Sequence, residues 1–327
     1  MMNWAEKIVS IKNESEFNTL TIEAFSLQYE NNSTYKAYCQ KLNKHPENVK
    51  IINEIPFLPI EFFKTHNIIA NNKKQQITFT SSGTTGAQTS RHHVIDLAIY
   101  ERSFISAFSH FYGAIEDYCI LALLPSYIER GGSSLVYMAN KLIELSMHAD
   151  SGFYLNNYKQ LFEKLEAINK TNKKVLLLGV TYALLDLAEQ YPIALQNAII
   201  METGGMKGHR KELVREELHS ILCMAFGVTT IHSEYGMTEL LSQAYSKGNG
   251  IFETPGWMKI RIRDTYDPFT FLSENRSGGI NVIDLANINS CCFIETKDIG
   301  KVFSDKTFTV LGRFDQSDIR GCNLLVG

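Results

Sequence analysis

The chain has 327 residues, of which 44% are hydrophobic, and its formal net charge is -3. This length suits one large α/β domain or about two average domains, and the apolar fraction is enough to build a sizeable core. Lysine and arginine form no long cluster, so a nucleic acid is not expected as a partner.

The sequence carries no segment of signal-peptide or membrane-helix type. Residues 1–10 are mixed and amphipathic, and no apolar run reaches the ~18 residues that a membrane helix needs. The six cysteines are scattered without a Cys-x-x-Cys pair, which favours reduced thiols over a disulfide framework or a zinc site. We therefore expect a protein without a membrane span that resides in the cytoplasm.

Residues 1–78 are predicted to form a helical lead-in that packs on the main domain. Apolar residues recur at helical spacing between positions 4 and 42. Residues 55–64 contain two prolines three positions apart, which predicts an extended, aromatic-rich segment in the core.

A loop rich in hydroxyl groups, residues 80–86, follows a predicted strand at 76–79. Its two glycines let the backbone approach a ligand, and its N–H and hydroxyl groups can surround a phosphate. A plain Ser/Thr/Gly linker has the same composition, so the loop by itself leaves both interpretations open. A Walker-type loop is excluded, because no Gly-Lys-Ser/Thr follows the second glycine.

Predicted strands and helices alternate through residues 79–250, which predicts a mainly parallel sheet flanked by helices, with ligands at the strand ends. The expected strands are 118–124, 174–180, 197–202 and 229–232. The expected helices are 96–112, 182–190 and 209–226. Glycine-rich turns lie after several of these strands.

Strands replace helices in the last part of the chain, which predicts a β-rich subdomain over residues 251–327. The expected strands are 257–263, 279–285, 291–296 and 307–311. Cys291 and Cys292 lie in one of these apolar strands and are predicted to belong to the core.

Separated motifs stand in one order along the chain: Ser-Ser-Gly-Thr-Thr-Gly, a Gly-Gly turn, Glu-Tyr-Gly-Met-Thr-Glu, and Lys-Asp-Ile-Gly followed by Gly-Arg-x-Asp. Together they resemble the adenylate-forming superfamily over residues 79–321. Within it, the lead-in Ile-Pro-Phe-Leu-Pro, the loop Ser-Tyr-x-Glu-Arg and the ending Arg-Gly-Cys-Asn-Leu are most similar to the acyl-protein synthetases of LuxE type. These enzymes are known from the fatty acid reductase complex of bacterial bioluminescence.

The resemblance implies ATP-dependent, AMP-forming activation of a carboxylic acid, expected to be a fatty acid, and transfer of the acyl group to a protein thiol. ATP and Mg²⁺ are the implied cofactors, and an acyl reductase or acyltransferase is the implied protein partner. Two alternatives stay open. The chain could be a phenylacetate-type acid:CoA ligase, or a noncatalytic acyl- or nucleotide-binding subunit of a complex.

The resemblance assigns the β and γ phosphates and the adenine to two sets of residues. The implied phosphate-binding residues are Ser81, Ser82, Gly83, Thr84, Thr85 and Gly86. The implied adenine-binding residues are Gly204, Gly205, Tyr235 and Gly236.

Four further residues receive roles from the same motifs. Thr238 would touch the α-phosphate, and Glu239 would coordinate Mg²⁺, an ion that prefers oxygen ligands. Asp298 would bind the ribose hydroxyls, and Arg313 would be the arginine of the hinge motif. The alternatives are a solvated loop residue for Glu239 and a turn residue bonded to its own backbone for Asp298.

The larger members of the superfamily continue into a small mobile domain whose lysine contacts the substrate carboxylate. That domain is expected to be absent here. Three alternatives stay open: Lys207, Arg130 or Arg320 replaces the lysine, the adenylation step is slow, or a partner completes the site. By its position, Cys322 matches the cysteine that accepts the acyl group in the resembled family. A small buried hydrophobe is the alternative for this cysteine.

Overall fold

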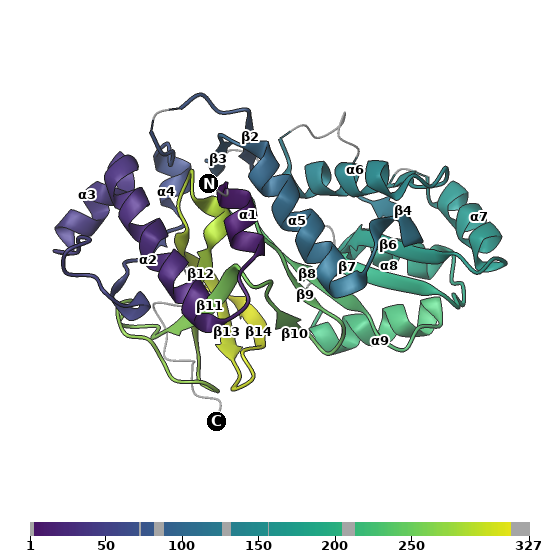
Figure 1. Ribbon diagram of the computed structural model, residues 1–327. Helices are drawn as coiled ribbons and strands as arrows, with labels where there is room; N and C mark the ends of the chain where they lie inside the picture. Colours follow the sequence, from purple (N-terminus) through teal and green to yellow (C-terminus); the bar gives the residue numbers. More distant parts are fainter. Residues whose placement is uncertain are drawn as a thin grey trace.

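The computed structural model describes residues 3–71, 73–81, 88–125, 132–155, 157–204 and 213–314. Figure 1 shows an elongated molecule in which the amino-terminal helices lie beside the last strands of the chain, and the α/β part extends to the other side. The site described below lies where strands from these two regions meet.

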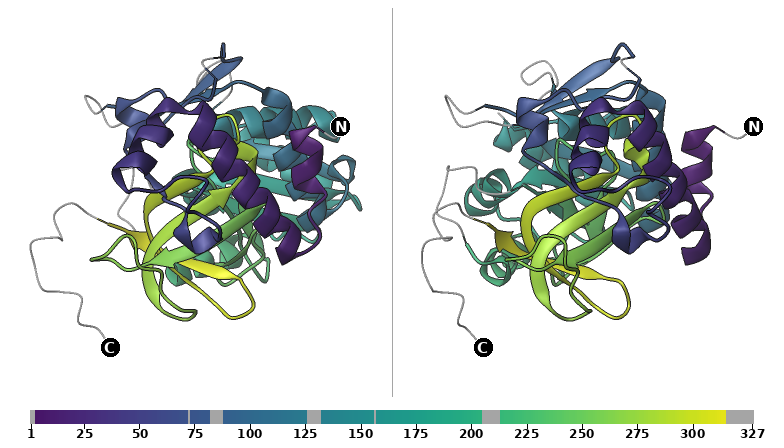
Figure 2. Two further views of the ribbon diagram at one scale, coloured as in Figure 1. Left: turned by 60° about the vertical axis from the view of Figure 1, so that its left-hand side comes forward. Right: turned by 90° about the vertical axis from the view of Figure 1, so that its left-hand side faces the viewer.

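The first helices begin at asparagines whose side chains accept a backbone N–H bond, which is the usual N-cap arrangement. They are α1 (Trp4–Val9), α2 (Glu14–Asn31) and α3 (Ser33–Lys41). Gln28 of α2 donates to the carbonyl of Asn287 at 2.9 Å and accepts from the N–H of Cys292 at 2.9 Å. In the left view of Figure 2, α2 crosses in front of the strands near the end of the chain, and α1 lies to one side.

The proline-containing segment 55–64 is extended at first and then turns into a short helix. Its aromatic and apolar side chains are buried, with Phe57 5% exposed and Phe63 fully buried, so the predicted packing role is confirmed. The elements here are η1 (Ile52–Glu54), β1 (Leu58–Pro59), α4 (Phe62–Thr65), β2 (Ile77–Thr80) and β3 (Arg91–Val94).

The predicted parallel sheet with flanking helices is confirmed in the middle of the chain (Figure 1). Its parallel strands are β4 (Tyr118–Leu123), β5 (Gly152–Phe153), β6 (Lys174–Val180), β7 (Ala198–Thr203) and β8 (His232–Tyr235). The helical elements are α5 (Leu97–Tyr112), η2 (Ile115–Asp117), α6 (Ser134–Ser146), α7 (Tyr158–Asn169), α8 (Thr181–Gln190) and α9 (Arg215–Phe226).

The strands of the last third continue the same sheet in antiparallel order, so hydrogen bonding is unbroken from β5 to β11. They are β9 (Ala244–Ser246), β10 (Ile251–Glu253), β11 (Met258–Arg263), β12 (Ser277–Asp284), β13 (Phe293–Val302) and β14 (Phe308–Arg313), with η3 (Leu285–Asn287) between β12 and β13. Each of the four strands expected here is present. The division at residue 250 remains a prediction.

Several predicted boundaries are wrong. Helix α9 begins at Arg215, because Val214 is extended, and residues 209–212 lie outside the described residues. Strand β8 lies three residues later than expected, because pairing with β7 and β9 carries it through Glu234 and Tyr235 in spite of their polar groups. Cys291 and Cys292 are fully buried, as predicted, but precede β13.

Candidate active site

Three predicted residues from β8, β13 and β14 meet at one carboxylate. The hydroxyl of Tyr235 donates to Oδ2 of Asp298 at 2.8 Å, and Nε of Arg313 lies 3.1 Å from Oδ1 of the same carboxylate. Asp298 and Arg313 are register partners across β13 and β14. Asp298 therefore does not bond its own backbone as a turn residue would, and that alternative is wrong.

Burial and charge act on Asp298 in opposite directions. Burial raises the pKa of its carboxyl, and Arg313, Tyr235 and Arg263 lower it. Within the described ranges, each carboxylate oxygen has one hydrogen-bond or ion-pair partner and retains further acceptor capacity. Asp298 can therefore accept hydrogen bonds from the hydroxyls of a ligand.

The Gly-Met-Thr-Glu turn follows β8 directly and is held from two sides. Its Thr238 carbonyl accepts a 2.8 Å hydrogen bond from Nδ1 of His92, and the Glu239 carbonyl accepts one of 2.9 Å from Nδ2 of Asn287. Glu239 is 5% exposed, so its interpretation as a solvated loop residue is wrong.

The Glu239 carboxyl lies in a mixed environment. Burial raises its pKa, whereas a hydrogen bond from the Ser90 side chain and the charges of Arg313 and Lys64 lower it. The Arg313 charge therefore acts on both predicted acidic residues, Asp298 and Glu239. A carboxylate offers the oxygen ligands that Mg²⁺ prefers, and the positive charges of Arg313 and Lys64 would attract phosphates.

The start of the hydroxyl-rich loop is tied to the same region. Ser81 pairs with Ser90, through Ser81 N–H to the Ser90 carbonyl at 3.1 Å and Ser90 N–H to Ser81 Oγ at 2.9 Å. The N–H of Thr80 donates to the carbonyl of Gly132 at 2.7 Å, which brings in the loop before α6. The rest of the predicted phosphate loop lies outside the described residues: Ser82, Gly83, Thr84, Thr85 and Gly86.

The end of β7 lies next to the start of the Glu-Tyr-Gly motif. The Thr203 hydroxyl donates to the Glu234 carboxyl, which lies against Gly236; a Cβ there would come within 2.4 Å of Glu234 Oε1. Gly204 adopts a positive φ of 67°, and its carbonyl accepts from the Thr181 hydroxyl at 2.6 Å. These contacts place Gly204 and Gly236 at the ends of neighbouring strands.

Glu234 is a second acidic group of this motif, and its pKa is raised well into the neutral range. Its pKa is raised to about 7, mainly by burial. The hydrogen bond from Thr203 lowers the pKa, and the charge of Glu202 raises it. It is therefore partly protonated near neutral pH. No sequence pattern separates Glu234 from the other acidic loop residues.

Two further residues of the site were not among the predicted ones. Ser90 connects Ser81 with Glu239, and His92 holds the carbonyl of Thr238. Burial lowers the His92 pKa to about 4, so the ring is neutral with its proton on Nδ1. As expected for neighbours on a strand, His92 is buried and His93 is more exposed; the alternation alone did not favour His92.

Some predicted residues cannot be placed. Cys322, Gly205, Lys207, Arg130 and Arg320 all lie outside the described residues. In the described part of the chain, burial raises the pKa of every cysteine thiol: Cys39, Cys119, Cys223, Cys291 and Cys292. These thiols do not match the low-pKa type of a reactive cysteine.

The described residues contain neither a membrane-spanning helix nor a cluster of metal-ligating side chains. Among them, no helix combines the length and apolar character needed to cross a membrane. Nor do His, Cys, Asp and Glu side chains of the described ranges gather in a group of three or more that could hold a metal ion.

The fold is that of the adenylate-forming enzymes. ATP-bound MatB from Rhodopseudomonas palustris is similar, with a TM-score of 0.55 and 15% identity over 74% of this chain and 49% of that one, so this chain spans about half of its length. A 2-hydroxyisobutyryl-CoA ligase in complex with 2-HIB-AMP has a TM-score of 0.66 and 10% identity, over 92% of this chain and 68% of that one.

The chain belongs to the family "Acyl-protein synthetase, LuxE", which matches residues 6–327. The long-chain-fatty-acid–luciferin-component ligase of Vibrio harveyi is 24% identical over 332 residues, which cover 92% of this chain and 84% of that protein. The predicted family, the adenylate-forming α/β fold and the class of ligase are confirmed, and this class of enzyme uses ATP.

Proposed function

We propose that the chain activates a long-chain fatty acid with ATP and passes the acyl group to a protein thiol. The observation that carries the proposal is the convergence of Tyr235, Asp298 and Arg313 beside the Thr238–Glu239 turn. The substrate class follows the name of the Vibrio harveyi relative, a long-chain-fatty-acid ligase.

In this proposal the nucleoside binds between the strand ends. Asp298 accepts hydrogen bonds from the ribose hydroxyls through the acceptor capacity that Tyr235 and Arg313 leave free. The adenine lies against Gly204 and Gly205 and beside Tyr235 and Gly236. The position of Gly204 and Gly236 at the ends of the neighbouring strands β7 and β8 supports this placement.

The triphosphate is assigned to the hydroxyl-rich loop and the turn after β8. Residues 81–86 hold the β and γ phosphates through N–H and hydroxyl groups, and Ser90 keeps Ser81 near Glu239. Glu239 fits Mg²⁺, because a cation next to this buried carboxylate would offset the burial that raises its pKa. When bound, Mg²⁺ would neutralise part of the phosphate charge.

The proposed reaction has two steps. A carboxylate oxygen of the acid attacks the α-phosphorus, and the bond to pyrophosphate breaks; Thr238 stabilises the charge on the α-phosphate oxygens. A thiolate then attacks the acyl carbon, and AMP leaves with the electron pair of the broken C–O bond. The side chains hold the reactants in place and provide hydrogen-bond donors that are oriented before the negative charge develops.

Cys322 is the proposed acceptor thiol. The raised pKa values of the described cysteines support this choice, since a thiol held in its neutral form is a poor nucleophile. An acyl reductase or an acyltransferase would then receive the acyl group from this cysteine.

Exchange of labelled pyrophosphate into ATP tests the proposal. We expect that exchange requires a long-chain fatty acid and Mg²⁺. Addition of coenzyme A should not increase the rate at which the acid is consumed. Absence of exchange with every fatty and aromatic acid would contradict adenylation. Release of acyl-CoA in step with ATP use would instead identify an acid:CoA ligase.

A further inference from the structure

Asp298 lies at the end of an irregularity between β12 and β13. Gly279 pairs with Ile299, but Asn281 pairs with Glu295, so one residue of β12 faces residues 296–298 of β13. A bulge of this kind changes the direction in which a strand presents its side chains. The bulge therefore decides where the Asp298 carboxylate points.

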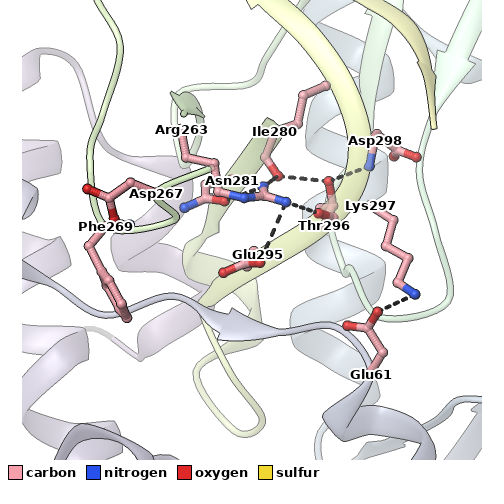
Figure 3. A network of polar contacts seen from close by, with 10 residues as sticks. All are labelled: Glu61, Arg263, Asp267, Phe269, Ile280, Asn281, Glu295, Thr296, Lys297 and Asp298. Carbon is pink, nitrogen blue, oxygen red and sulfur yellow. Dashed lines mark hydrogen bonds and ion pairs between the residues drawn. The ribbon is translucent and has the colours of Figure 1, made fainter. Parts of the chain in front are cut away.

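The Arg263 guanidinium lies beside this bulge, between Asn281 and Thr296 (Figure 3). Its Nη1 donates to the carbonyl of Ile280 at 3.0 Å and to Oδ1 of Asn281 at 2.8 Å, and its Nη2 donates to the carbonyl of Thr296 at 2.7 Å. The Thr296 hydroxyl donates to the Ile280 carbonyl at 2.8 Å and accepts from the N–H of Asp298 at 3.1 Å. Arg263 is thus connected to Asp298 through one residue.

The surroundings of Arg263 are shaped to hold a buried cation. Arg263 is only 6% exposed, and Oε1 of Glu295 lies 3.6 Å from its Nη2. Gly279 leaves room for the guanidinium, because a Cβ at that position would lie 2.4 Å from the Arg263 Cζ. The guanidinium reaches its three acceptors from two nitrogens held in one rigid plane, whereas all the donors of a lysine ammonium leave a single nitrogen.

Arg263 also contacts the chain just after the hinge arginine. The guanidinium lies 5.5 Å from the centre of the Phe314 ring, and the N–H of Phe314 donates to the carbonyl of Lys297 at 2.8 Å. The side chain of Lys297 forms an ion pair with Glu61 at 2.5 Å. The bulge is therefore fixed at each of its three residues.

We propose that Arg263 is a positioning residue for nucleotide recognition, which sets the 296–298 bulge so that Asp298 faces both Tyr235 and the ribose hydroxyls. The inference rests on the proposed nucleotide site. We expect Arg263 to affect ribose recognition and to leave the phosphate and adenine contacts unchanged. Among its described partners, Arg263 contacts neither the Thr238–Glu239 turn nor Gly204.

Dissociation constants for ATP, 2′-deoxy-ATP and 3′-deoxy-ATP provide the test. The wild-type chain should prefer ATP by about tenfold or more, the effect of a hydrogen bond to a charged group. Arg263→Met should bring the ratio of each deoxy-ATP dissociation constant to the ATP dissociation constant close to one, as should Asp298→Asn. The double variant should show no further loss of the preference for ATP. Arg261→Met is the matched control, because Arg261 lies in the same strand and binds Asn53 instead, at 2.6 Å; its ratio should stay at the wild-type value.

The outcomes separate the inference from the proposed function. A wild-type ratio in a folded Arg263→Met variant would overturn the inference and leave the proposed function intact. A wild-type chain without any preference for ATP would overturn the ribose role of Asp298 and the inference with it, whereas failed pyrophosphate exchange would count against adenylation alone. If Arg263→Met does not fold, Gly279→Ala displaces the guanidinium and keeps its charge, and should reduce the ratio in the same way.

Discussion

Asp298 and Arg313 face each other across β13 and β14, with Nε of the arginine 3.1 Å from a carboxylate that is almost fully buried. The arginine side chain itself is 72% exposed. An exposed partner of this kind contributes little to stability, but its charge still acts on the proton affinity of the buried group. The two effects can be separated by experiment.

Arg313→Met should change the free energy of unfolding by less than about 1 kcal/mol, since exposed ion pairs contribute little. The same change should raise the pKa of Asp298, because a lowering charge is removed. ATP binding should therefore weaken most on the acidic side of the pH range. Chemical denaturation and ATP titrations at several pH values check both points; a large loss of stability would contradict the first.

Tyr235→Phe keeps the ring and removes the hydroxyl that donates to Asp298. We expect weaker ATP binding, by about three- to tenfold, with the fold intact. Tyr235→Ala also removes the edge contacts with Phe252 and Phe308 and should cost about 3–5 kcal/mol of stability. Comparison of the two variants by ATP titration and urea denaturation separates recognition from packing. Equal ATP affinity of wild type and Tyr235→Phe would contradict a role for the hydroxyl.

Ser90→Ala removes the side-chain hydrogen bond that lowers the pKa of Glu239. If Glu239 binds Mg²⁺, the Mg²⁺ concentration for half-maximal pyrophosphate exchange should rise about tenfold. Ser26→Ala is a suitable control, because that hydroxyl bonds only a carbonyl of its own helix at 3.1 Å. An unchanged Mg²⁺ requirement in Ser90→Ala would argue against the assigned role of Glu239.

Glu234 should make stability depend on pH near neutrality. Its pKa is about 7 in the folded chain and near 4.5 when unfolded, so the folded state holds the extra proton between these values. Its contribution is fully present below pH 4.5 and is lost as the pH rises through 7, up to about 3 kcal/mol. Glu234→Gln should remove this loss, as measured by urea denaturation between pH 5 and 8. An identical pH slope in both proteins would contradict the raised pKa.

His92 and His232 should change the pH dependence of stability in the direction opposite to that of Glu234. Burial lowers the pKa of each to about 4, below the value of 6.5 in the unfolded chain. The unfolded state then binds more protons between these values, so their contribution is present above pH 6.5 and is lost as the pH falls towards 4. His232→Gln should flatten the acid side of the stability profile. Denaturation curves from pH 4 to 7 provide the measurement.

Cys322→Ser should leave pyrophosphate exchange intact and abolish stable labelling of the chain by a radioactive fatty acid, because adenylation does not need the thiol. Cys223→Ser is the control, since Cys223 is the partly exposed cysteine of the described residues and its thiol pKa is raised. Labelling that survives Cys322→Ser would identify another acceptor.

The sequence predicted those parts of the site that lie in continuous motifs. Tyr235, Thr238 and Glu239 belong to one motif, and Asp298 and Arg313 to another, so the resemblance of these motifs to the adenylate-forming superfamily was enough to find them. Ser90, His92 and Arg263 act through contacts with distant segments and lie in no recognisable pattern. Tertiary pairing also decided the position of β8, because its polar residues hide the alternation expected of a strand.

The unbroken sheet has a practical consequence for protein engineering. Tyr235 belongs to the parallel half of the sheet, whereas its hydrogen-bond partner Asp298 belongs to the antiparallel half. Strands β9 and β10 pair with each other and lie on the two sides of residue 250. A chimera joined near residue 250 would therefore combine a tyrosine from one parent with a carboxylate from the other. Exchange of substrate-binding segments between relatives should respect this pairing and transfer β8, β13 and β14 together.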